Sequence, residues 1–326
     1  MKILILTDGK AGHENQSKAF ARALGAESEI RPVHFKCSFA KSLSYLLDNI
    51  GIRTSCLFSL EGPAPSRSDG FDAVVGTGSG TFYAAKTIAR GIGAKCGVVL
   101  YPRGYDIASF DCILAPSFDR PPAAPNVLEI PANLVAADAA FYEDGVKNFR
   151  EHHLRTTGRE VDDSVRAVAV IIGGPNKCST LSPEWMREQL DAVFAANKPT
   201  DADPRPVRFW TTTSRRTPQE VEAVVDSFPW DYKLVYSRDQ FNPIPAFVSL
   251  ADALYVTAES TGMLSEACTS GSAEVHALDN LNPGPHKFRR FLNDLKENGY
   301  IDGRRKVDLS MQFAAARTLL AHDTQD

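Results

Sequence analysis

The sequence is poor in the features that mark several protein classes. Its six cysteines are scattered, and no two form a Cys-x-x-Cys pair. Zinc fingers and thioredoxin-like redox sites need such short spacings, so neither is expected, and a reducing compartment is favoured. No apolar run approaches the roughly 18 residues of a membrane-spanning helix, and the opening MKILILT is too short for the core of a signal peptide. A P-loop sequence is also absent.

The chain also lacks a strong excess of either charge. It has 36 Lys and Arg against 40 Asp and Glu, for a net charge of −4. This balance gives no basic stripe of the kind that binds nucleic acid, so no nucleic-acid partner is expected. The 43 % hydrophobic and 23 % charged residues are typical of a globular protein. The length of 326 residues suits two domains of about 150 residues each.

Short apolar runs alternate with amphipathic stretches, a pattern that predicts parallel α/β sheets covered by helices. We expect strands at 2–7, 29–35, 73–76, 97–101, 111–115, 127–130, 167–172, 207–211, 233–236, 253–257 and 273–277. We expect helices at 14–24, 81–90, 183–196, 218–227, 243–250, 261–269, 285–298 and 311–320.

The alternation breaks once, in a highly polar stretch near 140–165, where we place a domain boundary. The prediction is two Rossmann-like domains facing a cleft, over residues 1–150 and 160–305. We expect the tail, 306–326, to pack back on the first domain. Ligands of such sheets bind beyond the carboxyl ends of the strands, so the turns there are the candidate sites.

The first such turn, Asp8-Gly-Lys-Ala-Gly-His-Glu-Asn-Gln, carries six polar side chains. His13 precedes the helix and is a candidate general base near neutral pH, with Asp8 and Glu14 as alternatives. The remaining polar or glycine positions form a candidate acceptor-side loop: Lys10, Gly12, Asn15 and Gln16. The alternative is a solvated loop that caps the helix.

A second glycine-rich turn, Gly76-Thr-Gly-Ser-Gly-Thr, departs from the Gly-x-Gly-x-x-Gly pattern of dinucleotide-binding loops. Its Gly78 and Ser79 either approach a substrate closely or form a tight turn only.

Three turns of the second half suit a phosphate. Gly173 and Gly174 follow a buried strand and leave backbone N–H groups to face an anion. Ser214 and Arg215 follow the next strand, ahead of a capping box predicted from Thr217 through Pro218 to Glu220. After the strand 253–257, a helix begins whose N-terminus can hold phosphate, at Ser260, Thr261 and Gly262. Glu266, further along that helix, can accept hydrogen bonds from ribose. The alternative for Ser214 and Arg215 is a solvated loop, and the alternative for Glu266 is a solvated helix residue.

This last segment resembles the nucleotide-binding half of two-domain (GT-B) glycosyltransferases, through Ala251-Asp252 and Ser265-Glu266-Ala267. Nearly the whole chain resembles the mitochondrial fission Elm family, whose bacterial members are usually described as glycosyltransferases. The motifs that carry this resemblance occur in the same order: the turn from Asp8 to Gln16, Ile172-Gly-Gly-Pro, Thr212-Thr-Ser-Arg-Arg-Thr-Pro, Asn242-Pro, and Thr257 to Ala267.

The resemblance implies transfer of a sugar from a nucleoside diphosphate, with uridine as the expected base, to an acceptor hydroxyl of a lipid or surface glycan. It implies donor binding by the second domain. Gly173, Gly174, Ser260, Thr261 and Gly262 would hold the diphosphate, Ser214 and Arg215 the phosphate or base, and Glu266 the ribose. It implies no cofactor and no metal, and we read Asp201-Ala-Asp203 as a solvated loop.

Two other functions fit the same architecture: a nucleotide-sugar 2-epimerase and a non-catalytic scaffold linked to membrane remodelling. We expect a cytoplasmic protein. The stretch 36–47 mixes lysines, leucines and aromatics, so it is either a helix on the first sheet or a peripheral contact at the inner face of a membrane.

Overall fold

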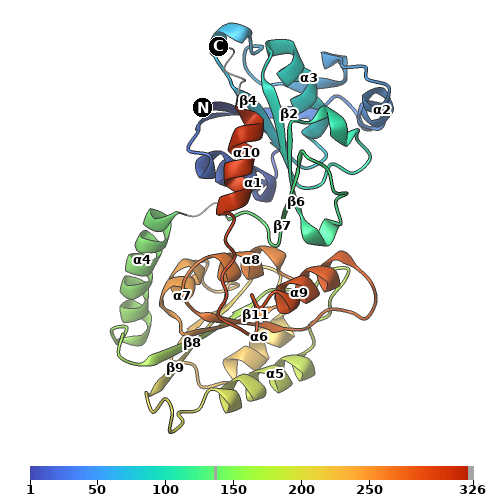
Figure 1. The fold of residues 1–326 in the computed structure, drawn as a ribbon. Helices are drawn as coiled ribbons and strands as arrows, with labels where there is room; N and C mark the ends of the chain where they lie inside the picture. The colour runs from blue at the N-terminus through green and yellow to red at the C-terminus, as the bar shows by residue number, and fades with distance from the viewer. Residues whose placement is uncertain (136–137, 322–326) are drawn as a thin grey trace. The chain divides into compact units, whose positions relative to one another are not determined.

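The computed structural model describes residues 1–135 and 138–321. The chain divides into two compact units, the first built from residues 1–136 and 308–326 and the second from 137–307 (Figure 1). Each unit is a sheet of mostly parallel strands covered by helices. The predicted α/β class with two Rossmann-like sheets is therefore confirmed. No helix among the described residues is long and apolar enough to cross a membrane.

In the described part of unit 1, seven strands form one sheet in the order β3-β2-β1-β4-β5-β6-β7. All neighbours are parallel except β2 and β3, which pair antiparallel. The strands are β1 (Lys2–Thr7), β2 (Glu27–Phe35), β3 (Phe58–Leu60), β4 (Ala73–Thr77), β5 (Lys95–Val99), β6 (Cys112–Pro116) and β7 (Val127–Ile130). The strand order reverses between the neighbours β1 and β4, which is where open α/β sheets bind ligands.

Four α-helices surround this sheet in the described residues. Helix α3 (Phe82–Ile92) packs on β4 and β5, and α2 (Ser38–Asn49) packs on α3. Helix α1 (Ala11–Ala23) contacts β1 and β4, while α10 (Ser310–Leu320, red in Figure 1) packs on β5, β6 and β7. Short 3-10 turns occupy Ser55–Leu57, Arg67–Asp69, Ile107–Ser109 and Ser117–Asp119.

A buried ion pair joins α2 to α3. Lys86 Nζ lies 2.8 Å from Asp48 Oδ2, and Arg53 lies 3.2 Å from Asp48 Oδ1. Lys86 also donates to the carbonyl of Asp106 at 2.6 Å and lies 3.9 Å from the centroid of the Phe110 ring. Burial lowers the pKa of Lys86, although Asp48 opposes this shift. The inner face of α2 is therefore held by charge as well as by the packing of Tyr45 and Leu47 against the core.

In unit 2, five strands among the described residues form a wholly parallel sheet in the order β10-β9-β8-β11-β12. They are β8 (Arg166–Ile172), β9 (Val207–Thr213), β10 (Tyr232–Leu234), β11 (Ala253–Thr257) and β12 (Glu274–Leu278). The helices are α4 (Ala139–Thr157), α5 (Pro183–Ala196), α6 (Gln219–Asp226), α7 (Ile244–Leu250), α8 (Thr261–Thr269) and α9 (Lys287–Glu297). Here the strand order reverses between the neighbours β8 and β11.

Helix α4 lies within the polar stretch where the sequence placed the domain boundary. Its buried residues are Phe149, His152 and His153, which do not make the apolar stripe that predicts a helix. Phe149 is fully buried, with its ring centroid 4.9 Å from that of Tyr232. His152 bonds to Tyr232 through Nδ1 and to Asp239 through Nε2. The helix is thus held by an aromatic and imidazole face that hydrophobic periodicity does not detect.

The structure differs from the predicted strands at two further places. Strand β3 was not predicted, because Phe58–Leu60 is short and lies at the sheet edge. The strand expected at 97–101 ends at Val99, because Leu100 adopts a positive φ of 74° and leaves the extended conformation.

The ion pair between Asp48 and Lys86 gives a prediction about stability. The substitution Asp48→Ala leaves Lys86 without its buried counter-charge, so we expect the free energy of unfolding to fall by about 3–5 kcal/mol. Urea denaturation measures the change. Asp201→Ala, on an exposed loop, is the matched control and should change little; a similarly small change for Asp48→Ala would contradict the role assigned to the pair.

Candidate functional sites

In unit 1, the turn after β1 and the first turn of α1 bring an aspartate and a histidine together. His13 is the third residue of α1, whereas the sequence predicted it just before the helix. His13 Nδ1 lies 3.0 Å from Asp8 Oδ1 and 3.1 Å from Oδ2. Burial acts to raise the pKa of Asp8, but the hydrogen bonds and charges of Lys10 and His13 outweigh it, so the pKa lies below its ordinary value. An ionised carboxylate only accepts hydrogen bonds, so Nδ1 of His13 carries the proton and Nε2 is left as the basic nitrogen.

The glycines of the β4 turn make room for this pair. A Cβ at Gly78, where φ is +82°, would lie 2.3 Å from the His13 ring, and a Cβ at Gly80 would lie 2.7 Å from the Asp8 Cβ. Side chains at these two positions would therefore displace the histidine or the aspartate. Between them, Ser79 Oγ accepts a hydrogen bond from Lys41 at 2.9 Å.

The other predicted residues of the first turn lie apart from the pair. Glu14 forms an ion pair with Lys18 at 2.6 Å, and the hydrogen bond from Lys18 is the main cause of its lowered pKa. Three residues of the predicted acceptor-side loop are exposed to solvent: Lys10, Gly12 and Asn15. Gln16 has a buried Oε1 with no hydrogen-bond partner in the described part of the chain. Of the two alternatives to His13, Asp8 therefore orients the histidine, whereas Glu14 pairs with a helix neighbour.

In unit 2, hydrogen bonds tie together the turns that follow β8, β9 and β11. The Gly173 N–H donates to Thr257 Oγ1 at 2.8 Å, and the Thr217 hydroxyl donates to the Gly173 carbonyl at 2.6 Å. A Cβ at Gly174 would lie 2.4 Å from the backbone of Arg216, so only glycine permits this approach. The structure therefore brings the predicted Gly173, Gly174 and Ser214 turns into one connected surface.

The predicted capping box at Thr217 is wrong. Helix α6 begins at Gln219, and its N-cap residue, Pro218, makes no side-chain capping hydrogen bond. Thr217 instead bonds to Gly173 and to the backbone N–H of Ser214, at 2.9 Å. The Thr217 hydroxyl joins the β8 and β9 turns because β8 and β9 are neighbours in the sheet, so the β8 turn lies beside Thr217.

Helix α8 begins at Thr261 with an open N-terminus. Its N-cap residue, Ser260, makes no side-chain capping bond, and the first turn holds no acidic residue. The first backbone N–H groups of a helix have no intrahelical partner and favour an anion. Arg215 and Lys177, on the neighbouring turns, are exposed, and neither has an ion pair or hydrogen-bonding side-chain partner within 1–135 and 138–321.

Glu259 lies among these turns, although the sequence analysis did not single it out. It is 2 % exposed, and Thr257 Oγ1 lies 3.1 Å from its Oε1. Oε2 of Glu259 and Nδ2 of Asn280 are both buried and lack a hydrogen-bond partner among the described residues. Burial raises the pKa of Glu259, while Asn280 and the nearby backbone act in the opposite direction. The signal available in the sequence was an acidic residue between a buried strand and an open helix N-terminus.

Glu266, the predicted ribose ligand, is engaged by a residue of α4. The hydroxyl of Tyr142 lies 3.1 Å from Glu266 Oε1 and 2.9 Å from the Ser270 hydroxyl. Burial raises the pKa of Glu266, and the Tyr142 hydrogen bond acts to lower it. One carboxylate oxygen is therefore occupied within unit 2.

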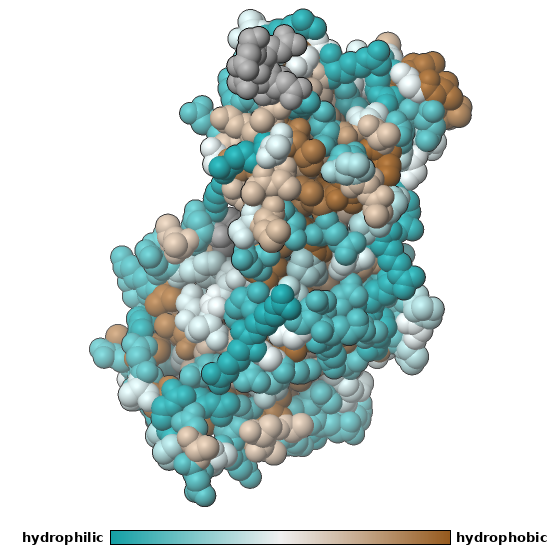
Figure 2. Space-filling model, viewed as in Figure 1, coloured by the Kyte–Doolittle hydropathy of each residue, from teal (hydrophilic) through white to brown (hydrophobic). Residues whose placement is uncertain are grey.

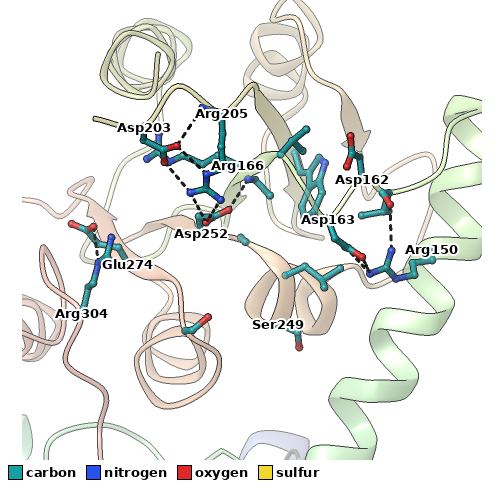
Figure 3. A pocket seen from close by; sticks show the side chains of 17 residues that line it. Arg150, Asp162, Asp163, Arg166, Asp203, Arg205, Ser249, Asp252, Glu274 and Arg304 are labelled. Atoms are coloured by element: carbon teal, nitrogen blue, oxygen red, sulfur yellow. Dashed lines mark hydrogen bonds and ion pairs between the residues drawn. The ribbon is translucent and has the colours of Figure 1, made fainter. Parts of the chain in front are cut away.

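A cavity of about 560 Å³ lies at the opposite, amino-terminal edge of the second sheet (Figure 3). Its charged side chains neutralise one another: Arg150 contacts Asp163 at 2.7 Å, and Arg205 bonds to Asp203 and Asp252. None of the predicted site residues line it. Within the described chain, no group of three or more His, Cys, Asp or Glu side chains is arranged as metal ligands.

Comparisons with known proteins bear on the family and the fold. The family model described as "Mitochondrial fission ELM1" matches residues 11–315. A search of curated proteins gives no match. Among solved structures, a UDP-GlcNAc 2-epimerase from Neisseria meningitidis bound to UDP-GlcNAc aligns with a TM-score of 0.50 and 12 % identity, over 98 % of both chains. MurG from Acinetobacter baumannii aligns with a TM-score of 0.47 and 14 % identity, over 98 % of this chain and 92 % of its own. E. coli ADP-heptose heptosyltransferase II aligns with a TM-score of 0.46 and 10 % identity, over 98 % of both chains.

The raised pKa of Glu259 gives a prediction about stability and pH. A carboxyl group with a raised pKa in the folded state contributes stability below its unfolded pKa, and that contribution is lost as the pH rises through the folded pKa. Glu259→Gln removes this ionisation. We expect the stability of the variant relative to wild type to increase as the pH rises from about 4.5, the ordinary value, towards neutrality. Urea melts across this range measure the difference; a difference that does not change with pH would contradict the prediction.

Proposed function

We propose that this chain, which belongs to the mitochondrial fission ELM1 family, is a glycosyltransferase that moves a sugar from a nucleoside-diphosphate donor to an acceptor hydroxyl. The observation that carries the proposal is the connected surface of unit 2, at the carboxyl ends of β8, β9 and β11. A glycine turn and an open helix N-terminus meet there with Arg215 and Lys177, which have no acidic partner in the described part of the chain. This is the location at which open α/β sheets bind ligands.

The donor diphosphate is assigned to this surface. The backbone N–H groups at the start of α8 offer hydrogen bonds to phosphate oxygens, and the helix dipole adds a positive end. The predicted N–H groups of Gly173 and Gly174 are instead engaged by Thr257 and Glu259, so these glycines shape the turn rather than bind the anion. Arg215 supplies a guanidinium with no competing acidic partner among the described residues, which suits the charge that develops on the leaving diphosphate. With these groups, the proposed transfer needs no metal or cofactor. In support, Asp203 of the Asp201-Ala-Asp203 sequence is paired with Arg205 rather than open to an ion.

The nucleotide is proposed to be uridine diphosphate. The epimerase from Neisseria meningitidis, whose fold is shared, is a complex with UDP-GlcNAc. Glu266 is the proposed ribose ligand: its Oε1 is bonded to Tyr142, which would hold the carboxylate in one orientation for the sugar hydroxyls.

His13 is the proposed general base. Asp8 holds the ring so that Nε2 is basic, and this nitrogen would accept the proton of the acceptor hydroxyl as it attacks the donor sugar. The role of Asp8 is to orient and stabilise the charged imidazole, as carboxylates do for catalytic histidines. The exposed residues of the same turn, Lys10 and Asn15, would contact the acceptor.

A peripheral location at the inner face of a membrane completes the proposal, because a lipid-linked acceptor would be presented there.

The donor site is tested by titration calorimetry of the purified chain with UDP. We expect Arg215→Ala to weaken binding by about tenfold or more, since a charge-assisted hydrogen bond contributes about 1.5–3 kcal/mol. Arg304→Ala, in the same unit but beside the amino-terminal cavity, is the matched control and should bind as wild type does. Absence of UDP binding, or equal effects of the two substitutions, would contradict the site and favour a scaffold.

The base is tested by assaying sugar transfer with a panel of nucleotide sugars and acceptors. We expect His13→Ala to lower kcat by about 10²–10⁴, and Asp8→Asn to lower kcat as well, while UDP affinity stays unchanged. His34→Ala, an exposed histidine of the same unit, is the control. Full activity of His13→Ala would refute the role, and a product formed from the donor alone, without acceptor, would indicate an epimerase.

A further inference from the structure

Helix α2 leaves large apolar side chains on its exposed face. Its buried residues include Ser44 and Asp48, whereas Phe39 and Leu46 are 73 % and 60 % exposed. Ile50, directly after the helix, is also 60 % exposed. Tyr45 and Leu47 pack against the core of unit 1, as expected for a helix on a sheet, but the exposed apolar residues take no part in that packing.

The exposed side chains form one stripe. Phe39, Leu46 and Ile50 are spaced by seven and four residues, which places them on the same side of a helix. Ile52, 46 % exposed, follows them in the chain. Figure 2 shows the apolar patch as the brown area where Figure 1 places α2. These four residues are called the α2 stripe below.

The inner face of α2 carries two polar side chains held by specific bonds, beside Tyr45 and Leu47, which pack against the core. The Ser44 hydroxyl lies 3.0 Å from the Tyr105 hydroxyl, and Asp48 pairs with Lys86 at 2.8 Å. These bonds fix the rotation of the helix, so the apolar residues cannot turn inward without breaking a buried ion pair.

The charge around the α2 stripe has one sign. The sole acidic residue from 36 to 53 is Asp48, whose side chain is 0 % exposed and neutralised by Lys86 and Arg53. Lys36 is exposed at the start of the segment, whereas Lys41 of the helix is half-buried and donates to Ser79 Oγ at 2.9 Å. The surface is therefore apolar with one exposed lysine beside it and no exposed acidic residue from 36 to 53, although the whole chain has a net charge of −4.

This combination suits a lipid surface better than a protein partner. A stable protein interface takes about 20–30 residues on each side, while the α2 stripe offers four large side chains on one convex helix. A helix lying in a membrane interface needs only an apolar face that enters the acyl boundary and basic residues that face anionic headgroups.

We propose that the α2 stripe inserts into the surface of an anionic lipid bilayer, with Lys36 facing the headgroups. The proposal rests on the proposed function only in that the membrane would present the acceptor. Lipid binding itself requires neither donor nor transfer, so the two can fail separately.

Co-sedimentation with vesicles tests the insertion, using the full chain without nucleotide. Wild type should pellet with mixed phosphatidylcholine and phosphatidylglycerol vesicles, and much less with phosphatidylcholine alone. The double substitution F39S and L46S should lower partitioning by about tenfold or more, because two inserted apolar side chains are lost. M311S is the matched control, since Met311 is 82 % exposed on α10 of the same unit, and it should pellet as wild type does.

A second variant tests the charge and guards against misfolding. K36Q should reduce the preference for anionic vesicles while leaving thermal melting unchanged, because Lys36 is exposed and outside the helix. Failure of wild type to pellet with either vesicle, or equal pelleting of the double variant, would overturn the proposal. It would also fall if the double substitution instead abolished self-association in sedimentation velocity, since a second copy would then cover the stripe.

If wild type binds vesicles but transfers no sugar, the proposed glycosyltransferase function is overturned and the lipid-binding role of the α2 stripe is kept. If it transfers sugar to a soluble acceptor but ignores vesicles, the surface falls alone.

Discussion

The candidate site of unit 2 depends on the hydrogen bonds made by one residue, Gly173. Its N–H donates to Thr257 after β11, and its carbonyl accepts from Thr217 after β9. A Cβ at this position would lie 1.9 Å from Glu259 Oε1, so the absence of a side chain permits both bonds. Because of these bonds, the open N-terminus of α8 and the free Arg215 belong to turns that are joined rather than independent.

Both units place their candidate sites by the same rule. In each sheet the strand order reverses once, between β1 and β4 and between β8 and β11. Helices leave such a pair of strands in opposite directions, so the turns there remain open to ligands. Unit 1 uses this position for the Asp8 and His13 pair, and unit 2 uses it for glycines and a helix N-terminus. Since the net charge is only −4, attraction for a phosphate must come from these local groups rather than from the field of the whole protein.

The sequence predicted those parts of the fold that depend on local pattern. Strands such as β1 and β11 appear at the expected residues because continuous apolar runs read as buried strands. It did not predict α4, whose buried face is formed by Phe149 and two histidines. Histidine is treated as polar when a sequence is searched for the apolar spacing of a helix. It assigned Thr217 to a helix cap, whereas the hydroxyl bonds to a residue 44 positions away in the chain. It passed over Glu259, whose burial depends on neighbours from three strands.

The sequence by itself determined the α/β class, most strand positions and the family, because apolar runs, turn residues and motif order are local properties of the chain. Only the tertiary structure decided which turns meet, since strand order is set by pairing between segments far apart in sequence. That pairing placed Gly78 against His13 and Gly80 against Asp8, while the packing of α4 left Glu266 bonded to Tyr142. It also turned Asp48 inward to Lys86, together with Tyr45 and Leu47, and left the α2 stripe outward.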